Sequence, residues 1–149
     1  MKARAALLAL VAATTVVGCT SKSEAPQQPA KAAGPQTIEI SYDDLLNQKQ
    51  ISRSVSLSVG DTLTVSLGST ASTGFQWTEK MLISDPKVIT QTAHQVIAPA
   101  ANQPGAPGKE VWTLQAKAPG NTTVSTTYGR PWPGGEKDSW VFSANVTVS

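Results

Sequence analysis

Few side chains in this sequence could carry out covalent chemistry. His94 is the only histidine, it lies in a strand-like run at 88–97, and no carboxylate adjoins it in sequence. The pair Asp43-Asp44 suits a turn or a helix N-terminus better than a general acid and base. The hydroxyl run at 71–74 does not match the Gly-x-Ser-x-Gly turn of serine hydrolases. The sequence therefore predicts no catalytic site, no metal site and no bound cofactor.

The only cysteine, Cys19, closes a short apolar leader. Lys2 and Arg4 precede an apolar run at 5–17, which is shorter than the ~20 residues of a membrane span and typical of a signal peptide. Val16-Val17-Gly18-Cys19 resembles the lipobox of bacterial lipoproteins, in which the cysteine thiol receives a diacylglycerol before the signal peptide is cleaved just ahead of it. The resemblance implies a signal peptide at 1–18 and a lipid on Cys19. The alternative is a plain secretory signal with a chance cysteine.

Processing at Cys19 would fix several properties of the mature chain. Its one thiol would be acylated, so disulfides and cysteine metal sites are not expected. Without Lys2 and Arg4 the twelve basic side chains become ten, equal to the ten acidic ones, and no basic surface for nucleic acid is predicted. Residues 19–36 lack large apolar side chains and predict a flexible tether. We expect a monomer anchored in the cell envelope, on the outer membrane where a cell has two, because position 20 is not Asp.

Three segments contain more Gly, Pro and aromatic residues than a simple connection needs. We name them the first loop (68–75), the second loop (99–108) and the third loop (129–135). The first ends in a glycine, which can adopt positive φ, followed by an aromatic residue. Taken singly, each could be ordinary turn chemistry. Together they predict a recognition surface, provided that the fold brings them to one place.

The segments between the loops alternate polar and apolar residues with a period of two. Such runs begin near 37 and recur at 55–59, 63–67, 111–118, 122–128 and 140–148, separated by turns such as Pro119-Gly120-Asn121. Only 42–50 suggests a helical turn. The pattern predicts an all-β domain at 37–149, an immunoglobulin-like antiparallel β-sandwich of seven or eight strands. Its expected core contains Val55, Leu57, Leu63, Val65, Val111, Leu114, Val124, Phe142 and Val146.

In chain order, the three loops resemble those of the chagasin-type inhibitors of papain-family cysteine proteases. That family has an Asn-Pro-Thr-Thr-Gly-aromatic loop, a Gly-x-Gly-Gly loop and an Arg-Pro-Trp/Phe loop. The residues that match these positions are Thr70, Ala71, Ser72, Thr73, Gly74 and Phe75, then Gly105, Ala106, Pro107 and Gly108, and finally Arg130, Pro131 and Trp132. Two departures stand out: Thr70-Ala71 replaces Asn-Pro, and Pro107 replaces a glycine.

The resemblance implies a reversible inhibitor whose three loops enter the active-site cleft of a papain-like protease as a wedge. Ser72 and Thr73 would approach the catalytic cysteine, and Trp132 would pack on the cleft rim beside Arg130. Losing Asn-Pro predicts a less organised first loop, and Pro107 predicts a stiffer second loop. The alternative is an envelope module that binds carbohydrate or another protein, for which Trp77, Trp112 and Trp132 would have to form an exposed platform.

Overall fold

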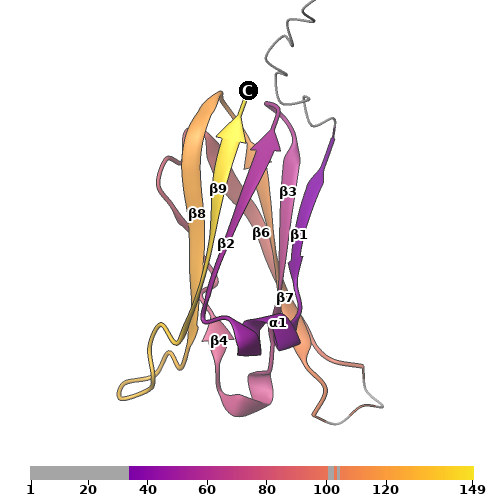
Figure 1. Ribbon diagram of the computed structural model, residues 1–149, viewed down its shortest axis with the longest axis vertical. Helices are drawn as coiled ribbons and strands as arrows, with labels where there is room; N and C mark the ends of the chain where they lie inside the picture. Colours follow the sequence, from indigo (N-terminus) through magenta and orange to yellow (C-terminus); the bar gives the residue numbers. More distant parts are fainter. Residues whose placement is uncertain (1–33, 101–102, 104) are drawn as a thin grey trace, which may run out of the picture.

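The computed structural model describes residues 34–100, 103 and 105–149 (Figure 1). The predicted signal peptide at 1–18, the lipidation site Cys19 and the tether up to residue 33 lie outside the described residues. No helix within the described ranges is long and apolar enough to cross a membrane.

Two β-sheets pack face to face, which confirms the predicted all-β sandwich (Figure 1). The first sheet has the strand order β1 (Gln36–Ile40), β3 (Thr62–Ser69), β7 (Gly108–Ala116), β6 (Ile89–Ile97). The second has the order β2 (Gln50–Leu57), β9 (Trp140–Val148), β8 (Gly120–Gly129), β4 (Gln76–Trp77), and β5 (Leu82–Ile83) also pairs with β8. The chain therefore forms more strands than the seven or eight predicted, because β4 and β5 are only two residues each.

The sheets are mixed, so the prediction of a purely antiparallel sandwich is wrong in this respect. β1 runs parallel to β3, and β2 runs parallel to β9. The other pairings are antiparallel. Parallel neighbours need a crossover rather than a hairpin. After β1 the chain passes through α1 (Tyr42–Asn47) to β2 in the other sheet before it returns as β3. The strands β3 to β8 lie between β2 and its partner β9.

The core lies between the sheets and contains most of the residues expected there. Leu57, Leu63, Val65, Leu114, Val124, Phe142 and Val146 are buried, and Val55 packs at the margin. Val111 is a correction: Glu110 and Trp112 occupy the inner face of β7, so Val111 between them points outward. Val59 is half exposed because β2 ends at Leu57 and a turn follows.

The predicted helical turn is confirmed as α1, and the acidic pair serves its N-terminus. Ser41 caps the helix by accepting the N–H of Asp44, and Asp43 and Asp44 occupy the first turn. Leu45 is the buried residue of the helix, and its carbonyl accepts the indole N–H of Trp140 at 2.8 Å. The helix thus closes one end of the sandwich, the end to which the three loops belong (Figure 1).

Candidate functional site

The first, second and third loops lie at one end of the sandwich, as predicted. They connect β3 to β4, β6 to β7 and β8 to β9, and Figure 1 shows all three connections below the sheets beside α1. The start of β1 and the end of β9 lie at the opposite end. The sheet register therefore brings together three segments that are far apart in sequence.

The first loop is built around Thr70, whose backbone and side chain are both hydrogen-bonded. Its N–H donates to the hydroxyl of Tyr128 at 3.0 Å, and its own hydroxyl donates to that of Tyr42 at 3.0 Å. The hydroxyl of Thr73 donates to the Thr70 carbonyl at 2.7 Å. Thr70 is buried at this junction. A threonine and two tyrosines therefore support this loop at the position where the family has Asn-Pro, and the expectation of a less organised loop stays a prediction.

Beyond Thr70 a single 3₁₀ turn, Ala71–Thr73, carries the loop tip. Ala71 and Ser72 are exposed. Gly74 ends the turn in the left-handed region with φ 79°, and its N–H donates to the Ala71 carbonyl at 3.0 Å. This conformation favours glycine strongly. The hydroxyl of Ser72 is thus presented at the tip of a hydrogen-bonded turn.

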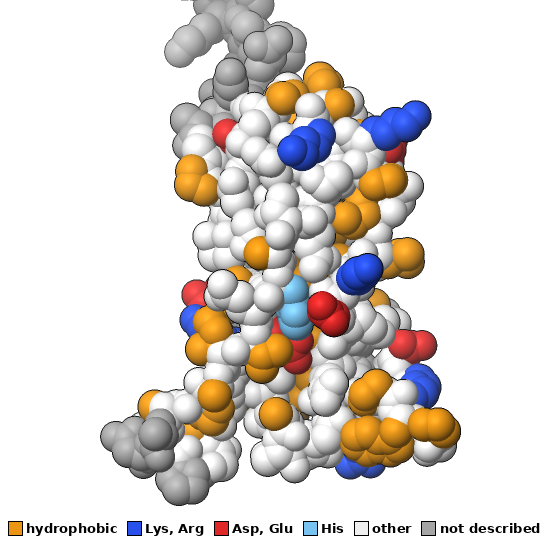
Figure 2. All heavy atoms as spheres, turned by 180° about the vertical axis from the view of Figure 1, so that it is seen from behind, with side chains coloured by type: hydrophobic (Ala, Val, Ile, Leu, Met, Phe, Trp, Pro, Cys, Tyr) orange, Lys and Arg blue, Asp and Glu red, His pale blue; other side chains and the backbone are white. Residues whose placement is uncertain are grey.

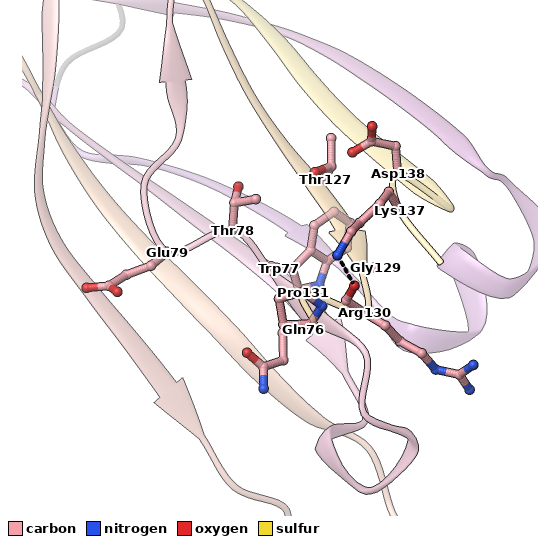
Figure 3. A pocket seen from close by; sticks show the side chains of 10 residues that line it. All are labelled: Gln76, Trp77, Thr78, Glu79, Thr127, Gly129, Arg130, Pro131, Lys137 and Asp138. Carbon is pink, nitrogen blue, oxygen red and sulfur yellow. Dashed lines mark hydrogen bonds between the residues drawn. The ribbon is translucent and has the colours of Figure 1, made fainter. Parts of the chain in front are cut away.

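The third loop is held mainly by its own backbone and by one lysine. The N–H of Gly135 donates to the carbonyl of Trp132 at 3.0 Å, and Gly134 has φ 78°. With Pro133 before that glycine, the geometry is that of a type II turn. The ammonium group of Lys137 donates to the carbonyls of Arg130 at 2.7 Å and Trp132 at 2.8 Å (Figure 3 shows the first of these bonds). Lys137 therefore fixes the Arg-Pro-Trp segment from outside the core.

The first and third loops form one continuous surface. The indole of Trp132 lies on the backbone of Gly74 so closely that a Cβ there would overlap the ring. The guanidinium of Arg130 stacks over the ring of Phe75, with its central carbon 4.6 Å from the ring centroid. Phe75 in turn packs against Tyr128 and Trp140. Trp132 keeps 46 % of its surface exposed, so it can contact a partner while its ring stays packed on Gly74.

The described residues of the second loop lie on the other side of the first loop. A cavity of about 180 Å³ separates the two loops, and it is lined from both. Ala71 and Ser72 form one wall, and Pro99, Gly105 and Ala106 form part of the other. Gly105 has φ 80°, while Pro107 is exposed. The first loop therefore stands between the other two.

A larger cavity of about 460 Å³ lies beside the third loop (Figure 3). Gln76, Thr78 and Glu79 line it from β4 and the residues after it, and Thr127 and Gly129 line it from β8. It contains no histidine or cysteine and no cluster of acidic side chains. Within the described ranges no group of three or more His, Cys, Asp or Glu side chains could hold a metal ion.

The one imidazole of the domain does not form a catalytic arrangement. Nε2 of His94 lies 2.9 Å from Oε2 of Glu110, and the hydroxyl of Ser69 donates to Oε1 of Glu110 at 3.3 Å. The carboxylate thus lies between the hydroxyl and the imidazole. A hydrolytic triad needs the imidazole between the other two, where it can take the proton of the hydroxyl. Sequence inspection could not find this pair, because the strand pairing of β6 with β7 creates it.

The positions of the tryptophans argue against the alternative of an aromatic platform. Trp77 and Trp112 are buried, at 4 % and 0 % exposure, and they meet edge to face inside the core. Their indole N–H groups donate to the carbonyls of Gly68 and Glu79. Only Trp132 of the three is available to a ligand, so no row of exposed rings lies on a sheet face.

Comparison with solved structures shows the same fold in three proteins, one of which is described as a cysteine protease inhibitor. The inhibitor EhICP2 from Entamoeba histolytica superposes with a TM-score of 0.58 at 18% identity, covering 77% of this chain and 97% of its own. PbICP-C, solved in complex with falcipain-2, gives a TM-score of 0.58 at 22% identity, covering 76% and 99%. Amebosin gives 0.52 at 18% identity, covering 78% and 100%. Comparison with curated protein sequences gives no match.

The family comparison agrees with the fold. The model of the chagasin family of peptidase inhibitors, I42, matches residues 56–146, which is well over half of the chain and includes all three loops. Members of this family inhibit proteases and are not enzymes. The chain belongs to the chagasin family of peptidase inhibitors.

Proposed function

We propose that this protein reversibly inhibits papain-like cysteine proteases by inserting the three loops into the active-site cleft as one wedge. The observation that carries the proposal is the contact of Trp132 with Gly74, together with the stacking of Arg130 on Phe75. These contacts join the first and third loops into one surface before any partner binds. A surface that is already ordered loses less conformational entropy on binding.

The roles of the loops follow from their shapes. The first loop projects the exposed Ala71 and Ser72 between its neighbours, so it is the part that can reach the floor of a cleft. The exposed indole of Trp132 is the type of side chain that contributes most to protein interfaces. PbICP-C was solved bound to falcipain-2, and we infer a partner of the same class here.

Arg130 adds a charge to the same surface. Its guanidinium is held over Phe75, and its Nε is buried without a hydrogen-bond partner in the described part of the chain. The ion pairs found among the described side chains, His94 with Glu110 and Lys109 with Glu39, do not involve it. A carboxylate on the rim of the target cleft could therefore pair with Arg130 without first displacing another.

The direct test is to titrate the purified mature domain against papain and a cathepsin. We expect stoichiometric, reversible inhibition that competes with substrate, because the wedge and the substrate would occupy the same cleft. If the folded domain leaves every papain-like enzyme tested fully active, the proposal is wrong. Inhibition that does not compete with substrate would also contradict the wedge.

We further propose that Cys19 anchors the inhibitor to the membrane of the cell envelope. β1 begins at the end of the sandwich remote from the three loops (Figure 1), so a chain that leads to an anchor there would leave the wedge free to meet a protease. Changing Cys19→Ser should abolish metabolic labelling with a fatty acid and release the protein into the soluble fraction. Labelling that persists in the variant would refute the anchor.

A further inference from the structure

A buried carboxylate lies directly behind the first loop. Glu110, on the inner face of β7, is only 4 % exposed and uses both of its oxygens. Oε1 accepts the hydroxyl of Ser69 at 3.3 Å and the backbone N–H of Trp77 at 3.2 Å, and Oε2 lies 2.9 Å from Nε2 of His94. A carboxylate is rarely buried in an all-β core unless it is fully hydrogen-bonded, and this one is placed where three structural elements meet.

Glu110 connects the two ends of the first loop. Ser69 is the last residue of β3, in the first sheet, and Trp77 ends β4, in the second sheet. The loop must cross from one sheet to the other between them. By accepting hydrogen bonds from both residues, one carboxylate oxygen sets the separation of the points at which the loop leaves the sandwich. The bond from the Trp77 indole to the Gly68 carbonyl, at 3.0 Å, closes the same junction.

His94 holds the other oxygen of Glu110 from the edge strand β6. Its ring stacks on Trp112 with the centroids 5.0 Å apart, and its side chain is 14 % exposed. Figure 2 shows the imidazole at the surface, with acidic side chains next to it. It lines a cavity of about 350 Å³ whose other walls include Ala71 and Phe75 of the first loop. The His94–Glu110 pair therefore lies beside the first loop as well as behind it.

We propose that Glu110 is a positioning residue for the first loop and that His94 holds it in place. The inference rests on the proposed function, because the effect of loop position is read in the strength of protease inhibition. Without the carboxylate, the buried N–H of Trp77 has no acceptor and the loop ends are free to separate. The loop then has to be ordered during binding, and affinity falls.

The test compares two substitutions of the same size at position 110. Glu110→Met removes both acceptors, and we expect it to weaken inhibition of papain by at least about tenfold. Glu110→Gln keeps an oxygen for Ser69 and Trp77 and can donate its amide to His94, so it should stay within about threefold of the wild type. A role confined to charge would impair both variants equally, because both remove the negative charge.

A destabilising change remote from the loops provides the matched control. Thr122 is buried on β8, where its hydroxyl bonds to Ser84 at 3.0 Å and accepts the N–H of Asp85 at 2.9 Å. Thr122→Val should lower the unfolding temperature and leave inhibition by the folded protein unchanged. If it weakens inhibition as much as Glu110→Met does, the effect of Glu110 is one of global stability and the positioning role is refuted.

Amide hydrogen exchange tests the loop without any protease. The N–H groups of Thr73 and Gly74 donate to the carbonyls of Thr70 and Ala71 at 3.1 and 3.0 Å, and Glu110→Met should speed their exchange more than that of the β8 amides. Unchanged exchange at both amides would overturn the proposal even if the wild type inhibited nothing. Should Glu110→Met fail to fold, His94→Phe keeps a ring on Trp112 and removes the donor. We expect that variant to weaken inhibition about threefold, and unchanged inhibition would overturn the role of His94.

Discussion

The first and third loops touch each other, yet the molecule supports them in different ways. The first is fixed from inside: Thr70 is buried, the hydroxyl of Tyr128 accepts its N–H, and Glu110 lies behind it. The third is fixed from outside, by its own type II turn and by the exposed Lys137. The support of the first loop is therefore part of the folded core, whereas that of the third is added at the surface.

Because of this difference, the effect of a substitution on the free energy of unfolding can be measured separately from its effect on the inhibition of a protease. Changes behind the first loop should alter both the free energy of unfolding and the inhibition of a protease. Changes in the third loop should alter inhibition with little effect on unfolding, because few of its contacts are buried. Four substitutions can test this separation.

Trp132→Ala should have the largest effect, and it should appear in binding. We expect inhibition to weaken by about 2 kcal/mol or more, roughly thirtyfold in the inhibition constant. The free energy of unfolding should change little, because the indole is 46 % exposed in the free protein. Inhibition titrations and thermal unfolding of the same preparations give both quantities. Equal inhibition by the variant and the wild type would remove Trp132 from the wedge.

Tyr128→Phe should lower the free energy of unfolding and also weaken inhibition. The substitution keeps the ring, which packs 4.9 Å from that of Trp77, but leaves the buried N–H of Thr70 without its acceptor. An unpaired buried donor costs about 1–3 kcal/mol in the free energy of unfolding, and the first loop should lose its position as well. Chemical denaturation measures the first effect and inhibition the second. A stability loss with wild-type inhibition would show that the first loop needs less support than we infer.

Gly74→Ala tests the contact between the loops. A left-handed φ costs a residue with a Cβ about 1 kcal/mol, and the new methyl group would displace the ring of Trp132. We expect a modest stability loss together with weaker inhibition. The control is Gly60→Ala, in the turn between β2 and β3, which is also at positive φ but has open space around its Cβ. If the two variants inhibit equally, the seat of Trp132 on Gly74 does not matter for binding.

Lys137→Met should have the smallest effect. It keeps the aliphatic stem and removes the donor to the carbonyls of Arg130 and Trp132. Since the lysine is exposed, the free energy of unfolding should change by less than about 0.5 kcal/mol. Inhibition should weaken a few-fold as the third loop gains freedom. Lys137→Arg, which can still donate, should recover most of the loss, and no recovery would argue against a role through hydrogen bonding.

Alternating patterns predicted the sandwich and most of its core, but could not predict how the strands pair. The run from Trp140 to Val148 was placed correctly because every second residue is apolar. In β7 the inner face begins with Glu110, a charged residue, so the alternating pattern wrongly favours Val111 as the core residue. The parallel partners β1 and β2 were equally inaccessible, since periodicity shows which face a residue occupies and not which strand lies next to it.

The candidate site, like the fold, could be predicted only in part. Short motifs identified the tips of the three loops, because glycine, proline and tryptophan are conspicuous in sequence. The supports escaped detection: Tyr42, Tyr128, Glu110 and Lys137 are ordinary residues until the fold brings them beneath a loop. For the same reason the sequence does not show that Thr70 is supported by two tyrosines at the position where the family has Asn-Pro.

The parallel pairing of β2 with β9 has a consequence for the order of folding. β9 lies between β2 and β8, and Gln50 pairs with Val141, so the two partners are separated by nearly the whole length of the domain. Pairings this distant in sequence make folding slow, because a long loop must close before they form. β4 and β5 pair with β8 directly, but β2 cannot join the second sheet until β9 is available. A chain that is exported unfolded would complete its fold only after β9 has emerged.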